Sequence, residues 1–301
     1  MSYEYSKELY DSLIKLISNN IIEIKPIPTE IEESLPNIME FDAVVFDIYG
    51  TLFISGSGDI SIVMGKSKNH FFSEVFSFFN ITVKNKKIDY SSIFYNIIEK
   101  HQNQRVADGI VNPEVNILEV WKDFILDLKN KKVIDIENIT NELLTAIAVK
   151  YEILVNPVYP MPGAIEFINK LRMHNKLLGI ISNAQFYTPL LFYLFWGKLP
   201  EELGFSHDLI IYSYQEKEAK PSKNLFLKVK KELQNQNISP SNVLYIGNDI
   251  KNDIYPASQI GFKTALFAGD KRSLRLRETE VSLSNIKPDY IIKNFRNIGG
   301  G

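Results

Sequence analysis

The stretch Ala43-Val44-Val45-Phe46-Asp47-Ile48-Tyr49-Gly50-Thr51 decides the predicted fold. Its first four residues form a short apolar run with β-branched and aromatic side chains, which is typical of a parallel strand buried on both faces. Asp47 follows this run directly. Parallel sheets carry their sites at the carboxyl ends of the strands. We therefore predict that Asp47 lies at the functional edge of a parallel sheet.

Strand-like and helix-like segments alternate after Pro162. This alternation predicts an α/β fold, with a parallel sheet covered by helices on both faces. We expect strands at 177–183, 208–214, 242–248, 263–269 and 288–294, and helices at 163–175, 222–235 and 253–261.

The chain divides into three parts by pattern. Residues 7–18 carry apolar residues at helical spacing, so we expect residues 1–40 to be an N-terminal helical extension that packs on the main body. From about residue 60 to 157 the pattern is mainly helical. We therefore assign residues 41–58 and 158–301 to the sheet core and residues 59–157 to a helical insertion.

Composition excludes several classes of function. The 301 residues are 45% apolar and contain no cysteine, which excludes a disulfide framework, a thiolate nucleophile and a cysteine metal site. The formal net charge of -2 gives no reason to expect nucleic acid or an anionic membrane as partner. With no apolar run near ~18 residues and a polar N-terminus, we expect a cytoplasmic protein that acts on a small molecule. A homodimer formed through residues 1–40 stays an open alternative.

Reactive side chains follow four of the predicted strands. Asp47 follows the first, Ser182 ends the second, Lys220 lies after the third, and Asp249 follows the fourth, with Asp253 one helical turn later. These groups are expected to converge on one edge of the sheet. Asp47 can attack phosphorus and form a covalent aspartyl intermediate, while Lys220 neutralises charge. Asp47 and Asp249 offer the hard oxygen ligands that Mg²⁺ prefers.

The segments DIYGT, ISN, KP and GNDIKND occur in this order, each after a predicted strand, and resemble motifs one to four of the haloacid dehalogenase-like superfamily. The resemblance covers residues 41 to 295. It implies a Rossmann-like core, an inserted α-helical cap and Mg²⁺ as cofactor. It also implies metal ligation by the carboxylates of Asp47 and Asp249 and by the backbone carbonyl of Tyr49. Asn248 is the alternative ligand in a register shifted by one residue, and we choose Asp249 because a carboxylate binds Mg²⁺ better.

The same resemblance assigns the remaining motif residues. It makes Asp253 a partner of Lys220 behind the metal ligands. We expect Thr51, Ser182, Asn183 and Lys220 to hold the transferring group. The function that we predict is magnesium-dependent hydrolysis of a small phosphorylated metabolite through an aspartyl-phosphate at Asp47.

Tyr49 departs from the phosphatase pattern, which usually has an aspartate at this position to protonate the leaving oxygen and activate water. A phenol with a pKa of ~10 can donate a proton but is a poor base at neutral pH. Losing a general acid-base group typically removes a factor of roughly 10²–10⁴ in rate. Either the leaving group needs little protonation, or another residue, such as one from the cap, supplies the proton.

Two alternatives stay open. DIYGT resembles motif one of the 2-haloacid dehalogenases, which carry tyrosine at this position and need no metal, so Asp47 could displace halide from carbon. Motif four, with Asp249 and Asp253, favours the phosphatase instead. The third reading is a catalytically silent binding protein with the same fold.

Arg272 and Arg275, in a charged run near the expected active edge, are candidates for binding an anionic group, although such runs are more often solvated.

Overall fold

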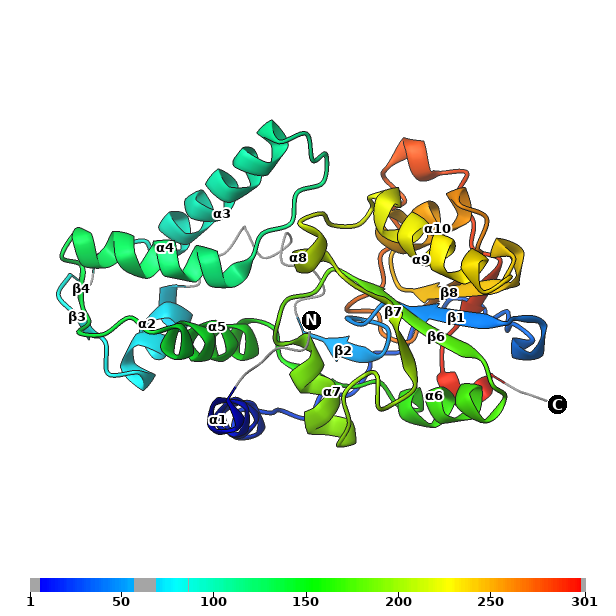
Figure 1. Cartoon of the computed structure of the whole chain (residues 1–301), viewed down its shortest axis with the longest axis horizontal. Coiled ribbons are helices and arrows are strands. Elements are labelled where there is room, and N and C mark those ends of the chain that lie inside the picture. The colour runs from blue at the N-terminus through cyan, green and yellow to red at the C-terminus, as the bar shows by residue number, and fades with distance from the viewer. Residues whose placement is uncertain (1–5, 57–68, 86, 299–301) are drawn as a thin grey trace.

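The computed structural model describes residues 6–56, 69–85 and 87–298. Its main feature is a six-stranded sheet in which all paired neighbours run parallel, in the order β10-β9-β8-β1-β6-β7 (Figure 1). The strands are β1 (Ala43–Phe46), β6 (Leu177–Ser182), β7 (Phe205–Tyr212), β8 (Val243–Gly247), β9 (Lys263–Phe267) and β10 (Tyr290–Ile292). The predicted α/β class with a Rossmann-like parallel sheet is confirmed.

Strand β1 lies in the middle of this sheet and is fully buried. Its side chains alternate between the two faces, so Val44 and Phe46 belong to one core cluster while Ala43 and Val45 belong to another. Helices α6 (Ala164–Met173) and α7 (Thr188–Trp196) contribute to the first cluster, and α9 (Lys223–Asn235) and α10 (Tyr255–Gln259) to the second. Burial on both faces explains why residues 43–46 are continuously apolar.

In the described part of the segment after motif one (69–85 and 87–157) the chain forms four helices: α2 (Asn69–Phe78), α3 (Tyr90–Ala107), α4 (Ile117–Asn130) and α5 (Asn141–Val155). They lie together at one end of the molecule, beside the sheet core (Figure 1). Two short strands, β3 (Thr82–Val83) and β4 (Ile134–Asp135), pair antiparallel within this segment. The helical character matches the sequence pattern. The domain boundaries stay predictions, and the one between residues 58 and 59 lies outside the described residues.

A second short antiparallel pair joins the two parts. Strand β2 (Phe53–Ser55) leads out of motif one and pairs with β5 (Val158–Pro160), which leads back into the core. The chain therefore leaves and re-enters the core through neighbouring strands. This pair, helix α7 and the one-turn helix α8 (Ser213–Glu216) were not predicted from the sequence.

Helix α1 (Lys7–Ser18) forms where the amphipathic pattern predicted it, with Leu13 and Ile17 buried. It packs against α5 and α7 (Figure 1). Beyond it the chain continues along the core, where Thr29 Oγ1 donates to the carbonyl of Ala268 at 2.6 Å. Residues 6–40 thus contact both the helical segment and the sheet core. In the part of the chain that the structure describes, no helix could cross a membrane.

Candidate active site

Asp47 lies immediately after β1, and 6% of its surface is exposed. Its Oδ1 accepts two hydrogen bonds, from Ser182 Oγ at 2.8 Å and from Lys220 Nζ at 2.7 Å. Ser182 ends β6, the neighbour of β1, so the parallel pairing brings these two strand ends together. Three residues that the sequence predicted to converge therefore do so.

Lys220 is buried between two carboxylates. Its Nζ lies 2.7 Å from Asp47 Oδ1 and 2.6 Å from Asp253 Oδ1. Burial alone would lower the pKa of the Lys220 ammonium, but Asp253 and Asp47 outweigh burial and raise this pKa to about 12. The side-chain oxygen of Asn183 accepts the backbone N–H of Lys220 at 2.8 Å and so fixes the lysine loop to the end of β6. Lys220 is thus held as a permanent cation beside Asp47.

Asp253 lies on the π-helical turn Ile250–Ile254 and is buried. Besides Lys220, it accepts Tyr245 Oη at 3.0 Å and the backbone N–H of Asp249 at 3.0 Å. A Cβ on Gly247 would overlap this carboxylate, so glycine at the end of β8 is what lets Asp253 approach. Burial raises the pKa of Asp253, while Lys220 opposes the shift. Asp253 is therefore a buried partner of Lys220, as the sequence indicated.

Asn248 connects motif four to motif one. Thr51 Oγ1 donates to its side-chain oxygen at 3.3 Å, and its amide nitrogen donates to the carbonyl of Ser273 at 2.6 Å. Gly50 lies against this amide with φ +87°, and a Cβ there would be 2.5 Å from Asn248 Nδ2. Both the positive φ and the close contact require glycine in DIYGT.

Asp249 caps the π-helical turn and is tied to an arginine. Its Oδ1 accepts the backbone N–H groups of Lys251 at 2.8 Å and Asn252 at 3.3 Å. Arg277 donates from Nε to Oδ1 at 3.0 Å and from Nη2 to Oδ2 at 2.6 Å. The loop carrying Arg277 runs beside motif four, because the N–H of Arg275 donates to the carbonyl of Asn248 at 2.9 Å. The negative charge of Asp249 is thus paired with the guanidinium of Arg277.

The Tyr49 hydroxyl is hydrogen-bonded to Thr188 Oγ1 at 2.9 Å. Burial raises the pKa of Tyr49 well above that of an exposed phenol, and the nearby carboxylates of Glu152 and Asp47 raise it further, although the Thr188 bond acts in the opposite direction. Tyr49 therefore stays protonated at neutral pH. It is unsuited to act as a base.

A cavity of about 490 Å³ opens onto these groups. On the core side it is lined by Asp47, Lys220, Asn248 and Asp249. The helical segment supplies the opposite wall, which combines aromatic and aliphatic side chains with two carboxylates: Phe94, Tyr95, Ile98, Trp121, Tyr151, Glu114 and Glu152. Such a site can hold a molecule that is anionic at one end and apolar at the other.

A family model for the haloacid dehalogenase-like hydrolases matches residues 41–261. The chain belongs to this hydrolase family. This match confirms the family that motifs one to four indicated.

Among solved haloacid dehalogenase-like (HAD) structures that resemble the chain, one with a TM-score above 0.5 shares its fold. The 2-haloacid dehalogenase from Pseudomonas syringae pv. tomato DC3000 has a TM-score of 0.53 and 14% identity, covering 85% of this chain and 95% of that one. The HAD phosphatase from Thermococcus onnurineus has a TM-score of 0.49 and 18% identity, covering 85% and 94%. CbbY from Rhodobacter sphaeroides in complex with phosphate has a TM-score of 0.48 and 15% identity, covering 86% of this chain and 96% of that one. No curated protein sequence matches the chain.

The donor atoms at this edge fit a magnesium ion. Mg²⁺ keeps several waters and takes few carboxylates, and Asp47 and Asp249 line one cavity with the amide oxygen of Asn248 beside them. Among the described residues no three His, Cys, Asp or Glu side chains form a metal cluster, so an ion here would rely on waters and on backbone or amide oxygens. Arg277 is already bonded to both oxygens of Asp249, so an ion bound by this carboxylate would compete with the guanidinium.

Several residues at this site of the HAD hydrolase have no signal in the sequence. Tyr245 faces Asp253 from the middle of a buried strand, and no local pattern distinguishes it from a core tyrosine. Arg277 belongs to the charged run after β9 in which Arg272 and Arg275 were singled out. Arg275 lines the cavity, whereas Arg272 donates to the carbonyl of Lys25 at 2.6 Å.

Proposed function

We propose that the chain is a cytoplasmic, magnesium-dependent phosphatase that hydrolyses a small phosphorylated metabolite through an aspartyl-phosphate at Asp47. Membership of the HAD hydrolases supports hydrolysis of a small molecule. The observation that carries the finer proposal is the position of Lys220, buried within 2.7 Å of Asp47 Oδ1 and 2.6 Å of Asp253 Oδ1. A fixed cation beside a carboxylate nucleophile suits attack on an anionic phosphoryl group.

The first step assigned to this site is attack on phosphorus. Both hydrogen bonds to Asp47 go to Oδ1, so we assign the attack to Oδ2. Ser182 and Lys220 orient the carboxylate, and Thr51, Ser182 and Asn183 are the groups that we assign to the oxygens of the transferring phosphoryl group. Water then releases phosphate and restores Asp47.

Magnesium, when bound, offsets the repulsion between an anionic nucleophile and an anionic substrate. The residues that we assign to hold it are Asp47, the backbone carbonyl of Tyr49, and Asp249, with Asn248 as the alternative to Asp249. Asp253 lies next to these groups rather than among the assigned ligands. It pairs with Lys220 and accepts the N–H of Asp249 at 3.0 Å, so it holds both residues in position.

A 2-haloacid dehalogenase is the second candidate, and Tyr49 is the observation that favours it. In that reaction Asp47 attacks carbon and expels halide, which needs no proton. Arg277 gives this candidate some support, because its pairing with Asp249 neutralises a carboxylate that a metal-free reaction would not use.

The test is a hydrolysis screen of acetyl phosphate, p-nitrophenyl phosphate and 2-chloropropionate, each with Mg²⁺ and with EDTA. Phosphate release that depends on Mg²⁺ is the expected result. Metal-independent release of chloride would replace the proposal with the dehalogenase. Tight binding of a substrate without turnover in either class would instead support a catalytically silent binding protein.

A further inference from the structure

We propose that residues 20–34 form a strap that ties the helical segment to the loop beside motif four and so restrains the opening of the cavity between the helical segment and the core. The family match begins at residue 41, so the strap lies outside the part of the chain that defines the HAD hydrolases. The restraint itself concerns only the structure, whereas its effect on turnover rests on the proposed phosphatase function.

The first end of the strap is fixed to helix α5. Asn20 Oδ1 accepts a hydrogen bond from Lys150 Nζ at 2.7 Å, and Asn20 Nδ2 donates to the carbonyl of Leu16 at 2.7 Å. The Lys150 side chain is 4% exposed and its Nζ also lies 3.2 Å from Glu74 Oε1 on α2. A buried ammonium needs such partners, because an unpaired buried charge is costly. Asn20 is therefore bonded to a charge that belongs to the inside of the helical segment.

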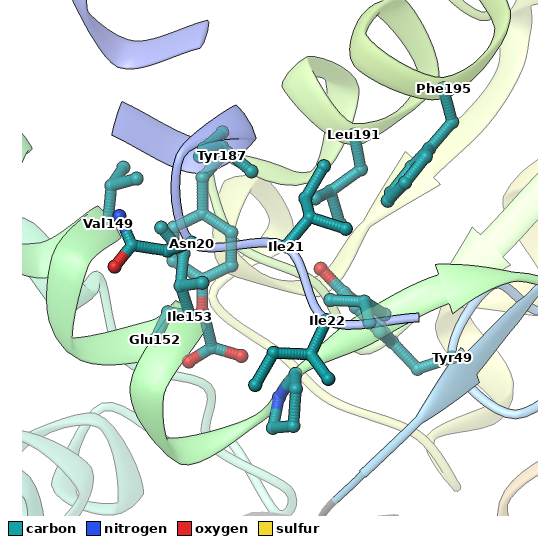
Figure 2. A pocket seen from close by; sticks show the side chains of 13 residues that line it. Asn20, Ile21, Ile22, Tyr49, Val149, Glu152, Ile153, Tyr187, Leu191 and Phe195 are labelled. Atoms are coloured by element: carbon teal, nitrogen blue, oxygen red, sulfur yellow. The ribbon is translucent and has the colours of Figure 1, made fainter. Parts of the chain in front are cut away.

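The next residues of the strap pack where the helical segment meets the core. Figure 2 shows Ile21 and Ile22 next to Glu152, which belongs to α5. Leu191 of α7 and Tyr49 of motif one line the same small pocket. Ile21 is half-buried and packs against the larger core cluster. Helix α5 belongs to the helical segment and α7 to the core, so the strap contacts both parts here.

The second end of the strap is fixed to the loop that follows β9. The N–H of Ile27 donates to Asp270 Oδ1 at 2.9 Å, and the carbonyl of Ile27 accepts the N–H of Lys271 at 2.8 Å. Arg272 Nη2 donates to the carbonyl of Lys25 at 2.6 Å. Asp270 is 1% exposed, and its bond from Ile27 is shorter than its bond from the N–H of Arg272 at 3.3 Å. The strap thus supplies a buried carboxylate with a donor that water does not replace.

The strap continues from this loop to the edge of the sheet. Ser34 and Ile291 of β10 exchange two backbone hydrogen bonds, at 3.0 and 2.8 Å, in an antiparallel bridge. Glu33 Oε1 accepts the N–H of Lys293 at 2.8 Å. The second end is therefore anchored over residues 25–34 rather than at a single point, while the first end depends on Asn20 and the packing beside it.

The loop held by the strap in turn holds motif four. The carbonyl of Ser273 accepts Asn248 Nδ2 at 2.6 Å, and the carbonyl of Asn248 accepts the N–H of Arg275 at 2.9 Å. The N–H of Ile250 donates to the carbonyl of Arg275 at 2.9 Å. Asn248 and Arg275 line the cavity. One short loop therefore connects the strap to the core wall of the cavity, and Asn20 connects it to the opposite wall.

The strap acts beside other connections between the two parts. The chain passes from one to the other at the β2–β5 pair, and Gln185 Nε2 of the core donates to the carbonyl of Val115 in the loop before α4 at 2.9 Å. A connection through two short strands can serve as a hinge, because a few residues absorb the rotation. An additional tie between the two parts reduces the rotation that such a hinge allows. We therefore expect the strap to limit how far the cavity opens.

The experiment lengthens the strap. A Gly-Ser-Gly-Ser insertion between Glu23 and Ile24 adds a flexible linker between its two ends and leaves the anchoring side chains unchanged. The chain contains no cysteine, so Glu99→Cys on α3 and Lys231→Cys on α9 give one exposed labelling site on each part. Double electron–electron resonance measures the distance distribution between spin labels at these sites. We expect the insertion to broaden this distribution and to shift it to longer distances.

A matched control carries the same insertion between Lys287 and Pro288, beside an exposed residue in the loop before β10, and should keep the unmodified distribution. Turnover of p-nitrophenyl phosphate should fall by roughly 2- to 30-fold in the strap variant, the range found for residues that couple two sites. Asn20→Ala should change both readouts in the same direction. Asn20→Asp keeps an acceptor for Lys150 and should restore the unmodified distribution.

An unchanged distance distribution in the strap variant would overturn the inference, whether or not turnover falls, and so would an equal broadening in the control. If the insertion prevents folding, Asn20→Ala decides the question, because its distribution must broaden if the strap restrains the helical segment. Failure of the unmodified protein to release phosphate would remove the proposed function, but the distance measurement would still test the strap.

Discussion

Arg277 holds both carboxylate oxygens of Asp249, with Nε 3.0 Å from Oδ1 and Nη2 2.6 Å from Oδ2. The side chains are 22% and 8% exposed, so the pair is largely shielded from solvent. Asp249 is the residue that the sequence predicted as a magnesium ligand. If Mg²⁺ binds through Asp249 as proposed, arginine and metal compete for one carboxylate.

Replacement of the arginine should reveal this competition. In Arg277→Gln, we expect Mg²⁺ to bind roughly tenfold more tightly, a change of ~1.4 kcal/mol, which is in the range of a charge-assisted hydrogen bond. Isothermal titration calorimetry of the protein with MgCl₂ measures this directly, without substrate. Arg272→Gln removes the same charge from the same loop and controls for the general electrostatic effect. Equal affinity in all three proteins would indicate that Asp249 is not a ligand and would favour Asn248.

Removal of the buried lysine should destabilise the fold strongly. Lys220→Met leaves Asp47 and Asp253 buried without their shared cation, and breaking a buried ion pair from one side costs about 3–5 kcal/mol. Urea unfolding at pH 8 measures the loss. Adding Asp253→Asn should recover part of it, because one uncompensated charge is gone. Additive losses in the double variant would contradict this coupling.

The same variant should show an altered pH dependence. Burial raises the pKa of Asp253 to about 7 although Lys220 opposes the shift, so Lys220→Met should raise the folded pKa further above the unfolded value of about 3.9. The folded state then binds the proton more tightly, so its stability is retained at low pH and lost as pH rises through the folded pKa. Lys220→Met should therefore be less destabilised at pH 5 than at pH 8. A loss that is the same at both pH values would argue against protonation of Asp253.

The site residues at the carboxyl ends of the strands were predictable, because their positions depend only on the order and direction of the strands. Asp47 follows β1, Ser182 ends β6 and Asn248 follows β8, and these three strands are neighbours in a parallel sheet. A buried parallel strand leaves a clear apolar run, and its carboxyl end is the place where polar residues gather. Helix α1 was predictable for a similar reason, since its apolar spacing repeats with the helical period.

The partners of these residues were not predictable, because they come from segments remote in sequence. Arg277 lies in a loop whose charged composition is typical of solvated surface, yet its guanidinium reaches Asp249. Glu152 lies on a helix whose pattern shows only which face is apolar. Its proximity to Tyr49 depends on how the helical segment packs on the core, and the spacing of apolar side chains along a helix does not predict that packing.

The Tyr49 hydroxyl should matter more for stability than for proton transfer. Tyr49→Phe removes the hydrogen bond to Thr188, which still accepts the backbone N–H of Gln185 at 3.3 Å. The expected loss in unfolding free energy is therefore only ~0.5–1.5 kcal/mol. Phosphate release should change little, since the phenol keeps its proton at neutral pH. A loss of roughly 10²-fold or more, typical of a removed general acid, would transfer that role to Tyr49.

Asp47→Asn should abolish turnover while the protein stays folded. The asparagine oxygen can still accept Ser182 Oγ and Lys220 Nζ, so the contacts at Oδ1 are retained, but the amide cannot attack phosphorus. Phosphate release from acetyl phosphate, measured beside the circular dichroism melting curve, separates loss of chemistry from loss of fold. Asp42→Asn, an exposed change just before β1, is the matched control and should stay fully active. Acetyl phosphate hydrolysis by Asp47→Asn at the unmodified rate would remove Asp47 as nucleophile and, with it, the covalent route on which the proposed phosphatase depends.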